Sequence, residues 1–134
     1  MKEFIWSTRV YYEDTDAGGV VYHGNYLRFM ERARTEWLRS LGYSQEELRE
    51  KEQIQFVVRH ITMKFHQSAR LDDLLDINTR IKKLGNAGFV FEQEIHNNEV
   101  LLCSAEIDIA CIHVKTGKPQ RIPNSLKARF NYVN

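Results

Sequence analysis

Residues 25–41 read NYLRFMERARTEWLRSL and show the clearest helical pattern in the sequence. Their apolar side chains recur every three or four positions, a spacing that places them on one stripe of an α-helix. The stripe consists of Tyr26, Phe29, Met30, Ala33, Trp37 and Leu41. Asn25 suits the N-cap of this helix, and Gly42 suits the position just after its end. We therefore predict one long amphipathic helix over 25–41, followed by a shorter helix that opens at Ser44 with the capping-box pattern SQEE.

Beyond residue 55 the helical period gives way to an alternation of apolar and polar residues, the pattern of half-buried strands. Odd positions such as Val57, Ile61 and Met63 then share one face of a strand. With a strand near the N-terminus, we expect strands at 5–12, 57–66, 75–84, 89–96 and 101–114. Their connections are too short for helical crossovers, so most pairing should be antiparallel. The predicted fold class is α+β, a five-stranded antiparallel sheet that packs its apolar face on the long helix.

This arrangement predicts apolar surface that one chain leaves uncovered. The sheet has two faces, and one main helix covers only one of them. Trp6, Phe89 and Phe91 add aromatic side chains that a monomer would leave partly exposed. We therefore expect a homo-oligomer.

The composition limits the class of protein. A chain of 134 residues with 43% hydrophobic residues can form one domain with its own core, and we assign residues 1–134 to a single domain. Its 19 Lys and Arg against 18 Asp and Glu give a net charge of +1, which argues against nucleic acid or an anionic membrane as the main partner. The N-terminal residues do not form a signal peptide, and no stretch approaches the ~20 apolar residues of a membrane span. We expect a globular domain without membrane insertion.

The cysteines agree with a reducing, cytoplasmic location. Cys103 and Cys111 share the apolar side of one predicted strand. At ~3.3 Å per residue they lie about 26 Å apart, which is too far for a disulfide. We expect reduced core thiols, which make poor nucleophiles because burial raises a thiol pKa.

The segment with the most chemical potential is YYEDTDAGGVVYHGNY, residues 11–26. Three carboxylates precede Gly18 and Gly19, and the long helix begins a few residues later. The N–H groups at a helix start can polarise a carbonyl oxygen, and a neighbouring carboxylate can attack an acyl carbon or activate a water. The glycines let the backbone turn tightly and let a ligand approach. Ordinary turn residues would show the same composition.

Two parts of the sequence resemble a known family. DTDAGGVVYHGNY (14–26), followed by ERARTEWL (31–38), is similar to the signature of the hotdog-fold acyl-CoA thioesterases of the 4-hydroxybenzoyl-CoA thioesterase family. The likeness is closest to the YbgC-like branch, which is associated with the Tol-Pal envelope system of Gram-negative bacteria, and it covers nearly the whole chain. It implies a five-stranded antiparallel sheet wrapped around a central helix, an acyl-CoA substrate and no cofactor. It also implies a homodimer with active sites at the subunit boundary, paired again into a homotetramer.

The resemblance also implies roles for residues of the motif. The catalytic carboxylate falls on Asp16, and the backbone N–H that polarises the thioester carbonyl falls on His23. Tyr12, Gly19 and Tyr22 flank the motif and are expected to bind substrate, although structural roles explain them as well. An aspartate with its ordinary pKa of about 3.9 is a weak base at neutral pH. This favours Asp16 as nucleophile, with general base as the alternative.

Carrier binding is where the sequence departs from the family. The hydroxybenzoyl-CoA member has a basic loop between its third and fourth strands that meets the CoA phosphates. Here that loop is GNAG, from Gly85 to Gly88, without a cation. Lys82 and Lys83 precede it, and Arg59 lies on a neighbouring strand. We expect Arg59, Lys82, Lys83, Gly85 and Gly88 to bind the carrier, with solvated surface residues as the plain alternative for the two lysines.

Two further functions compete with an acyl-CoA thioesterase. One is a thioesterase for acyl groups on acyl carrier protein, which predicts a basic rim around the entrance. The other is a non-catalytic acyl-binding or scaffold module of the envelope system, which the intact Asp16 and glycines disfavour. The histidines at 60, 66, 96 and 113 are scattered over strands without a carboxylate at ligand spacing, so we expect no metal site.

Overall fold

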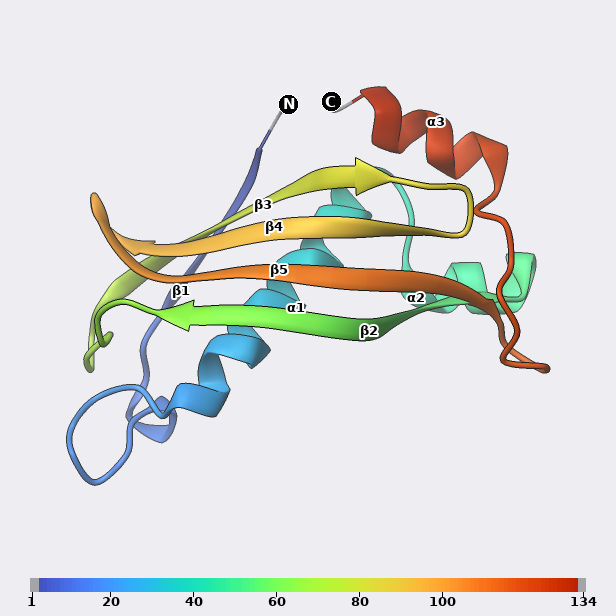
Figure 1. Cartoon of the computed structure of the whole chain (residues 1–134). Coiled ribbons are helices and arrows are strands. Elements are labelled where there is room, and N and C mark those ends of the chain that lie inside the picture. Colours follow the sequence, from blue (N-terminus) through green and yellow to red (C-terminus); the bar gives the residue numbers. More distant parts are fainter. Residues whose placement is uncertain (1–2, 133–134) are drawn as a thin grey trace.

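The computed structural model of the chain describes residues 3–132. Its sheet contains β1 (Phe4–Arg9), β2 (Ile54–Phe65), β3 (Leu74–Leu84), β4 (Gly88–Asn97) and β5 (Val100–His113). The order across the sheet is β1-β3-β4-β5-β2, and each neighbouring pair is antiparallel (Figure 1). The predicted α+β class and five-stranded antiparallel sheet are confirmed. The first strand ends at Arg9 rather than Tyr12, because the chain turns there into the short helix η1 (Tyr12–Asp14).

The long helix α1 (His23–Ser40) covers one face of this sheet. The predicted apolar stripe is buried, from Tyr26 to Trp37. Gly42 adopts the left-handed φ of +91° expected just after the helix. Asn25 is not the N-cap, however, because Tyr22 occupies that position and the helix begins at His23. Asn25 lies inside the first turn and is buried, with 5% of its surface exposed.

A shorter helical segment follows α1, as predicted. Ser44 caps α2 (Gln45–Glu47), where its hydroxyl accepts a hydrogen bond from the Glu47 N–H at 3.1 Å. The helix continues as a wider π-helical turn, η2 (Leu48–Glu52), and ends at Gln53 with a left-handed φ of 59°. This segment delivers the chain to β2.

The edge strand β2 contains a bulge that reverses its alternation. The pairing with β5 shifts between Val58 and His60, so Arg59 is the extra residue. Phe56 and Val58 before the bulge therefore face α1 together with Ile61 after it. The assignment of Val57 to the same face as Ile61 was wrong, because the prediction assumed an uninterrupted alternation.

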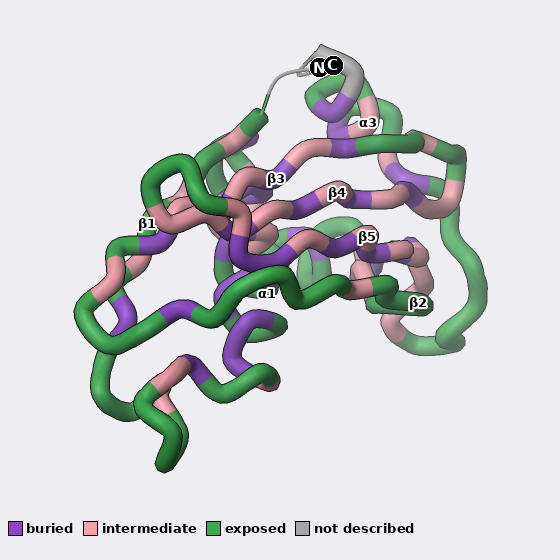
Figure 2. Tube along the Cα trace, turned by 60° about the vertical axis from the view of Figure 1, so that its left-hand side comes forward, coloured by how far each residue is buried: buried purple, intermediate pink, exposed green. Residues whose placement is uncertain are grey.

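A C-terminal helix, α3 (Asn124–Tyr132), is an element that the sequence reasoning missed. Its Phe130 is fully buried, with its ring centroid 5.0 Å from that of Phe89 and 4.9 Å from that of Trp37. Phe91 packs against Trp37 at a centroid distance of 4.9 Å. Phe89 and Phe91 are each only 3% exposed, so the expectation that one chain leaves them uncovered was wrong. Buried positions alternate along the central strands in Figure 2.

The outer face of the sheet is polar and needs no apolar cover. Arg80 pairs with Glu92 across the strands, and Lys82 pairs with Glu106. The two cysteines lie on the inner face and are free and buried, as predicted. Within residues 3–132, no helix is long and apolar enough to cross a membrane.

Candidate active site

The acidic segment before α1 folds into a tight turn centred on its two glycines. The Asp16 N–H donates to the Val20 carbonyl at 2.9 Å, and the Gly19 N–H donates to the Asp16 carbonyl at 3.0 Å. Gly19 has a φ of +81°, a left-handed conformation that glycine adopts without steric cost. The turn therefore holds Asp16 at a fixed place just ahead of the helix.

The Asp16 carboxylate has one oxygen engaged and one available. Its Oδ1 accepts a hydrogen bond from the Gly18 N–H at 2.8 Å. A Cβ at position 18 would lie 3.2 Å from that oxygen, so glycine there leaves room for the contact. Among residues 3–132 the Oδ2 atom has no hydrogen-bond partner, and the side chain is exposed. The turn thus orients the carboxylate through Oδ1 and leaves Oδ2 available.

The start of α1 presents a second reactive feature beside this carboxylate. His23 is the first helical residue, so its N–H has no acceptor within the helix, and the helix start carries partial positive charge. The His23 ring packs against Tyr22 at a centroid distance of 4.4 Å and against Phe65 at 6.4 Å. A Cβ on Gly24 would lie 2.8 Å from the Tyr22 ring, so glycine lets that ring fold over the helix start.

Two hollows meet at Asp16. One, of about 310 Å³, is lined by Asp16 and His23 together with Tyr26, Phe65 and the segment 66–68. The other, of about 480 Å³, is lined by Asp16 with Tyr12, Gly19 and Leu71. A thioester carries its acyl group on one side of the carbonyl carbon and its thiol group on the other. A carbonyl placed at Asp16 would have one hollow for each of these groups. The structure therefore brings together Tyr12, Asp16, Gly19, Tyr22 and His23.

Two residues of the first turn of α1 hold the site together, and sequence reasoning missed both roles. The Asn25 side-chain amide donates to the Asp14 carbonyl at 2.8 Å, where the Tyr22 N–H also donates at 3.0 Å. The Tyr26 hydroxyl accepts from the Ala69 N–H at 2.9 Å. Burial raises the pKa of Tyr26 above its ordinary value of 10.0. The signal for Asn25 was a polar residue at the edge of the apolar stripe, which we interpreted as a cap.

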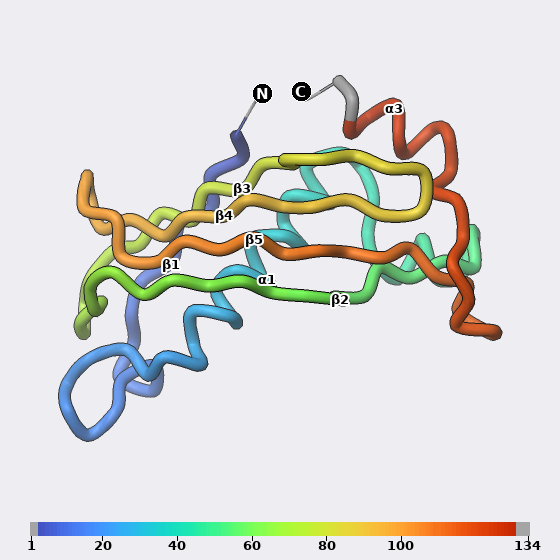
Figure 3. Tube along the Cα trace, viewed as in Figure 1, coloured from blue at the N-terminus to red at the C-terminus, as the bar shows by residue number. Residues whose placement is uncertain are grey.

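The residues predicted to bind the carrier lie far from Asp16 within one chain. Val20 pairs with Arg70, just before β3 begins, whereas Gly85 follows the end of β3. A strand of that length at about 3.3 Å per residue separates the two places by about 33 Å. The loop before α1 and the tip of the β3–β4 hairpin accordingly lie at opposite ends of the sheet (Figure 3).

Most of these carrier residues also have structural partners. Arg59 pairs with Asp108 at 3.0 Å, and Lys82 pairs with Glu106. The Gly85 N–H donates to the Gly88 carbonyl at 2.8 Å, which closes the hairpin. A Cβ on Gly88 would lie 2.6 Å from the backbone oxygen of Ile109, so the approach of β5 already requires glycine there. Their carrier role stays a prediction.

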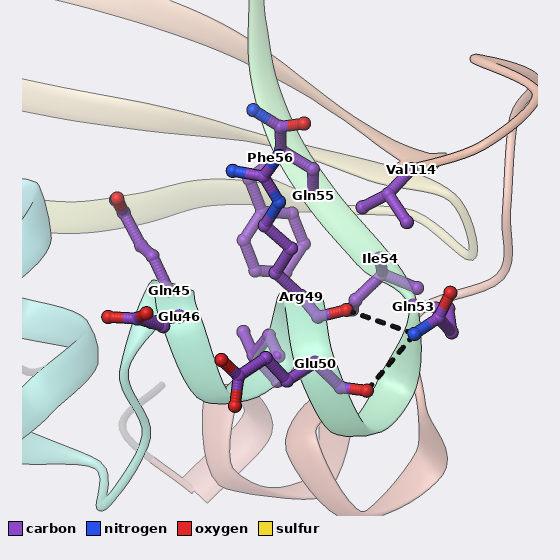
Figure 4. Close-up of a pocket in the computed structure, with 10 residues that line it drawn as sticks. Gln45, Glu46, Arg49, Glu50, Gln53, Ile54, Gln55, Phe56 and Val114 are labelled. Atoms are coloured by element: carbon purple, nitrogen blue, oxygen red, sulfur yellow. Dashed lines mark hydrogen bonds between the residues drawn. The ribbon is translucent and has the colours of Figure 1, made fainter.

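A hollow of about 710 Å³, larger than either of the two at Asp16, lies between α2, η2 and the start of β2 (Figure 4). Its wall is fixed by the Gln53 side-chain amide, which donates to the Glu50 carbonyl at 3.0 Å. It adjoins a smaller cavity of about 210 Å³, which Phe56 and Arg34 line. Burial lowers the pKa of Arg34. Size alone does not make either hollow a reaction centre, and neither is lined by the glycine-containing acidic segment or by the start of α1.

Metal ligation gives no competing site. Within the described part of the chain, no three His, Cys, Asp or Glu side chains are grouped closely enough to hold a metal ion. The groups that the structure places around Asp16 include its own carboxylate and the start of α1.

Comparisons with known proteins show the family to which the chain belongs. The model of the thioesterase superfamily matches residues 18–104. The acyl-CoA thioesterase YbgC of Haemophilus influenzae is 44% identical over 97% of this chain and 96% of its own length. The acyl-CoA thioester hydrolase YbgC of Escherichia coli is 48% identical over 95% of each chain. A probable thioesterase from Bartonella henselae superposes with a TM-score of 0.86 at 43% identity, covering 90% of this chain and 99% of its own. With its antiparallel sheet and central helix, the chain therefore belongs to the thioesterase superfamily, as a hotdog-fold thioester hydrolase related to the YbgC enzymes.

Proposed function

We propose that the chain hydrolyses acyl-CoA to a free acid and CoA at the Asp16 hollow. One observation carries this proposal: Asp16, whose Oδ2 accepts no hydrogen bond within residues 3–132, and His23, the first residue of α1, line the same hollow of about 310 Å³. The related YbgC proteins of Haemophilus influenzae and Escherichia coli bear the name of this activity. Together these support CoA thioesters as substrates.

The thioester carbonyl oxygen would accept the His23 N–H, which stabilises the negative charge that develops on that oxygen. Asp16 then attacks the acyl carbon, the CoA thiolate leaves and takes a proton from water, and a mixed anhydride forms. Water hydrolyses the anhydride and restores the Asp16 carboxylate. In the alternative route Asp16 takes a proton from a water that attacks the acyl carbon directly. Tyr12, Gly19 and Tyr22 would border the bound substrate.

A hydrolysis screen tests the activity. Purified protein is offered CoA thioesters of increasing acyl length and one acyl-carrier-protein thioester, and released thiol is measured. Repeated turnover in heavy-oxygen water separates the two routes, because label enters the Asp16 carboxylate only through the anhydride. Faster turnover of the carrier-protein thioester would favour the alternative carrier. Binding of acyl groups without hydrolysis of any thioester would favour the scaffold module.

We also propose that the working form is a dimer joined along β2. Within residues 3–132 this strand pairs with β5 on one side and with no strand on the other, and an open edge strand pairs readily with another chain. Its apolar Val58, Ile61 and Phe65 are 45%, 36% and 54% exposed. A second copy would cover both the strand edge and these side chains.

Such a dimer would also complete the active site. Antiparallel pairing about the middle of β2 sets Phe65, at the Asp16 end of the strand, beside Ile54 at the other end of the partner's strand. It thereby brings the cavity lined by Phe56 and Arg34 toward the partner's Asp16. Ile61→Lys would place a charge in this interface. Sedimentation should then show a monomer with little activity, and an active Ile61→Lys monomer would contradict the shared site. Two dimers would form the tetramer implied by the family resemblance.

We place this activity in the cytoplasm. Cys103 and Cys111 are both free thiols, which suits a reducing compartment. The association with the Tol-Pal envelope system is carried over from the YbgC-like resemblance and would be tested by copurification with its components.

A further inference from the structure

The side of α1 that faces the sheet carries a half-buried cation, Arg34. Within residues 3–132 no carboxylate lies within ion-pair distance of its guanidinium, whereas Arg39, Arg59 and Arg80 each form an ion pair. Burial lowers the pKa of Arg34, because water solvates its charge only in part. An anion from outside the chain would therefore stabilise this cation.

A buried glutamine holds the Arg34 side chain in place. Gln93 on β4 is fully buried, and its side-chain amide donates to the Met30 carbonyl at 3.1 Å and to the Thr79 hydroxyl at 2.9 Å. Because a carbonyl can only accept, this fixes the orientation of the amide, and its Oε1 accepts from Arg34 Nη1 at 3.0 Å. Within residues 3–132 the other N–H groups of the guanidinium have no hydrogen-bond partner. Arg34 is thus fixed before a ligand arrives and keeps donors available for one.

Arg34 lines a cavity of about 210 Å³ whose other walls are mostly apolar. The apolar walls include Trp37, Phe56 and Ile109, and Glu31 is the one carboxylate among the lining residues. Glu31 is exposed, so water screens its charge far more than it screens that of Arg34. The cavity therefore suits an apolar group that ends in a negative charge.

The cavity reaches the edge of the sheet along which we propose the dimer. Val58, an exposed residue of β2, is part of its lining. In the pairing that sets Phe65 beside Ile54 of the partner subunit, Phe56 lies opposite Met63 of the partner subunit. That place is two residues of strand, about 7 Å, from the end of β2 that lines the Asp16 hollow. An acyl group of a few carbons held at one Asp16 would reach the cavity of the other copy.

We propose that Arg34 selects acyl groups that end in a carboxylate, so that the preferred substrates are CoA half-thioesters of short dicarboxylic acids. This inference rests on the proposed function, and on the proposed dimer for the position of the cavity. The available N–H groups of Arg34 would donate to the distal carboxylate in charge-assisted hydrogen bonds, which are stronger than bonds between neutral groups. Trp37 and Phe56 would enclose the methylene groups that lead back to the thioester.

Matched pairs of thioesters test this selection. Succinyl-, glutaryl- and adipyl-CoA are compared with butyryl-, pentanoyl- and hexanoyl-CoA, which have the same number of acyl carbons but no distal carboxylate. In at least one pair the wild-type kcat/KM should be about tenfold or more higher for the acidic thioester, because a hydrogen bond to a charged group contributes that much. Arg34→Gln should remove this preference by lowering kcat/KM for the acidic thioester alone. Arg34→Lys, which keeps the charge, should restore part of it. Equal kcat/KM values in every pair would overturn the proposal.

Two controls accompany the variant. Arg32→Gln removes an exposed cation of α1 that does not line the cavity, and it should behave as wild type. Glutamine at position 34 can still donate to Gln93, so Arg34→Gln should fold and sediment as wild type does. A monomeric Arg34→Gln would show that Arg34 pairs with the second copy instead, and would overturn the proposal. The comparison on wild type needs no variant, so it decides even if Arg34→Gln does not fold.

Direct binding separates this inference from the proposed function. Glutaric acid monoamide carries one carboxylate and an amide in place of the thioester, and pentanamide is its uncharged counterpart. Calorimetry should show that the monoamide binds wild type more tightly than pentanamide does, and that Arg34→Gln loses this difference. If the protein hydrolyses no thioester but the monoamide binds through Arg34, the proposed function fails and the carboxylate site stands. If acyl-CoA is hydrolysed without preference and the monoamide binds no better than pentanamide, the proposed function stands and this inference fails.

Discussion

Replacing Asp16 by asparagine removes a negative charge and the attacking oxygen while it preserves the shape of the turn. The asparagine side-chain oxygen can still accept the Gly18 N–H that Asp16 Oδ1 accepts at 2.8 Å. Because the site is exposed, the free energy of unfolding should fall by less than ~1 kcal/mol. Loss of a positioned acid, base or nucleophile should lower kcat at least ~10²-fold, which corresponds to about 2.7 kcal/mol of barrier. KM should change little, because the carrier contacts lie elsewhere.

Asp14→Asn is the matched control for this experiment. The Asp14 carboxylate accepts the Tyr11 N–H at 2.9 Å, so its side chain caps the preceding turn. Its variant should retain much more activity than Asp16→Asn. Thioester hydrolysis is followed by thiol release, with circular dichroism as the check on folding. A folded Asp16→Asn protein that hydrolyses acyl-CoA at the wild-type rate would refute the mechanism.

Three further predictions concern the supports of the site and the core. Asn25→Ala removes the hydrogen bond to the Asp14 carbonyl, so kcat should fall about tenfold through misplacement of the turn, with a loss of ~1–3 kcal/mol in thermal or denaturant unfolding. Phe130→Ala opens a cavity beneath α3 and should reduce the free energy of unfolding by about 3–5 kcal/mol in urea, and an unchanged midpoint would show that α3 does not seal the core. Burial raises the pKa of Cys103 to about 12 from an ordinary 9.0. The folded chain thus holds the Cys103 thiol proton more tightly than the unfolded chain does. The stability that this difference contributes is complete below pH 9.0 and is lost as the pH rises toward about 12. The free energy of unfolding of wild type should therefore fall relative to that of Cys103→Val as the pH rises above 9.0.

The parts of the fold that the sequence predicted were those with regular hydrophobic periods. The stripe from Tyr26 to Trp37 predicted α1 and its buried face, because 18 residues repeat the pattern several times. The bulge at Arg59 was missed because an extra residue leaves no mark in an alternation of apolar side chains. Helix α3 was missed because nine residues offer few repeats, and its Phe130 is buried through contacts with Phe89 and Trp37 that are distant in the sequence.

The candidate site could be drawn from the sequence in part. Asp16 and His23 are close in the sequence and one turn joins them, so the motif that carries the family resemblance contains both, and their roles stay predictions. The role of Asn25 depends on a hydrogen bond to the backbone carbonyl of Asp14. A pattern of side chains in the sequence does not predict contacts with backbone groups. The distance between Asp16 and the loop that begins at Gly85 is set by the length of β3. Strand length alone does not tell whether one chain or two must form the site.

Mixing two defective variants decides whether the site is shared between copies. One chain carries Asp16→Asn with Lys82 and Lys83 intact, and the other carries Lys82→Gln with Lys83→Gln, expected to raise KM, and an intact Asp16. If each site takes Asp16 from one copy and the two lysines from the other, a mixed dimer contains one fully defective site and one fully intact site. Unfolding and refolding the mixture should then restore acyl-CoA hydrolysis with the wild-type KM, in up to a quarter of all sites. If both features served the same site within one chain, across about 33 Å of strand, no mixture would contain an intact site, and the low KM would not return.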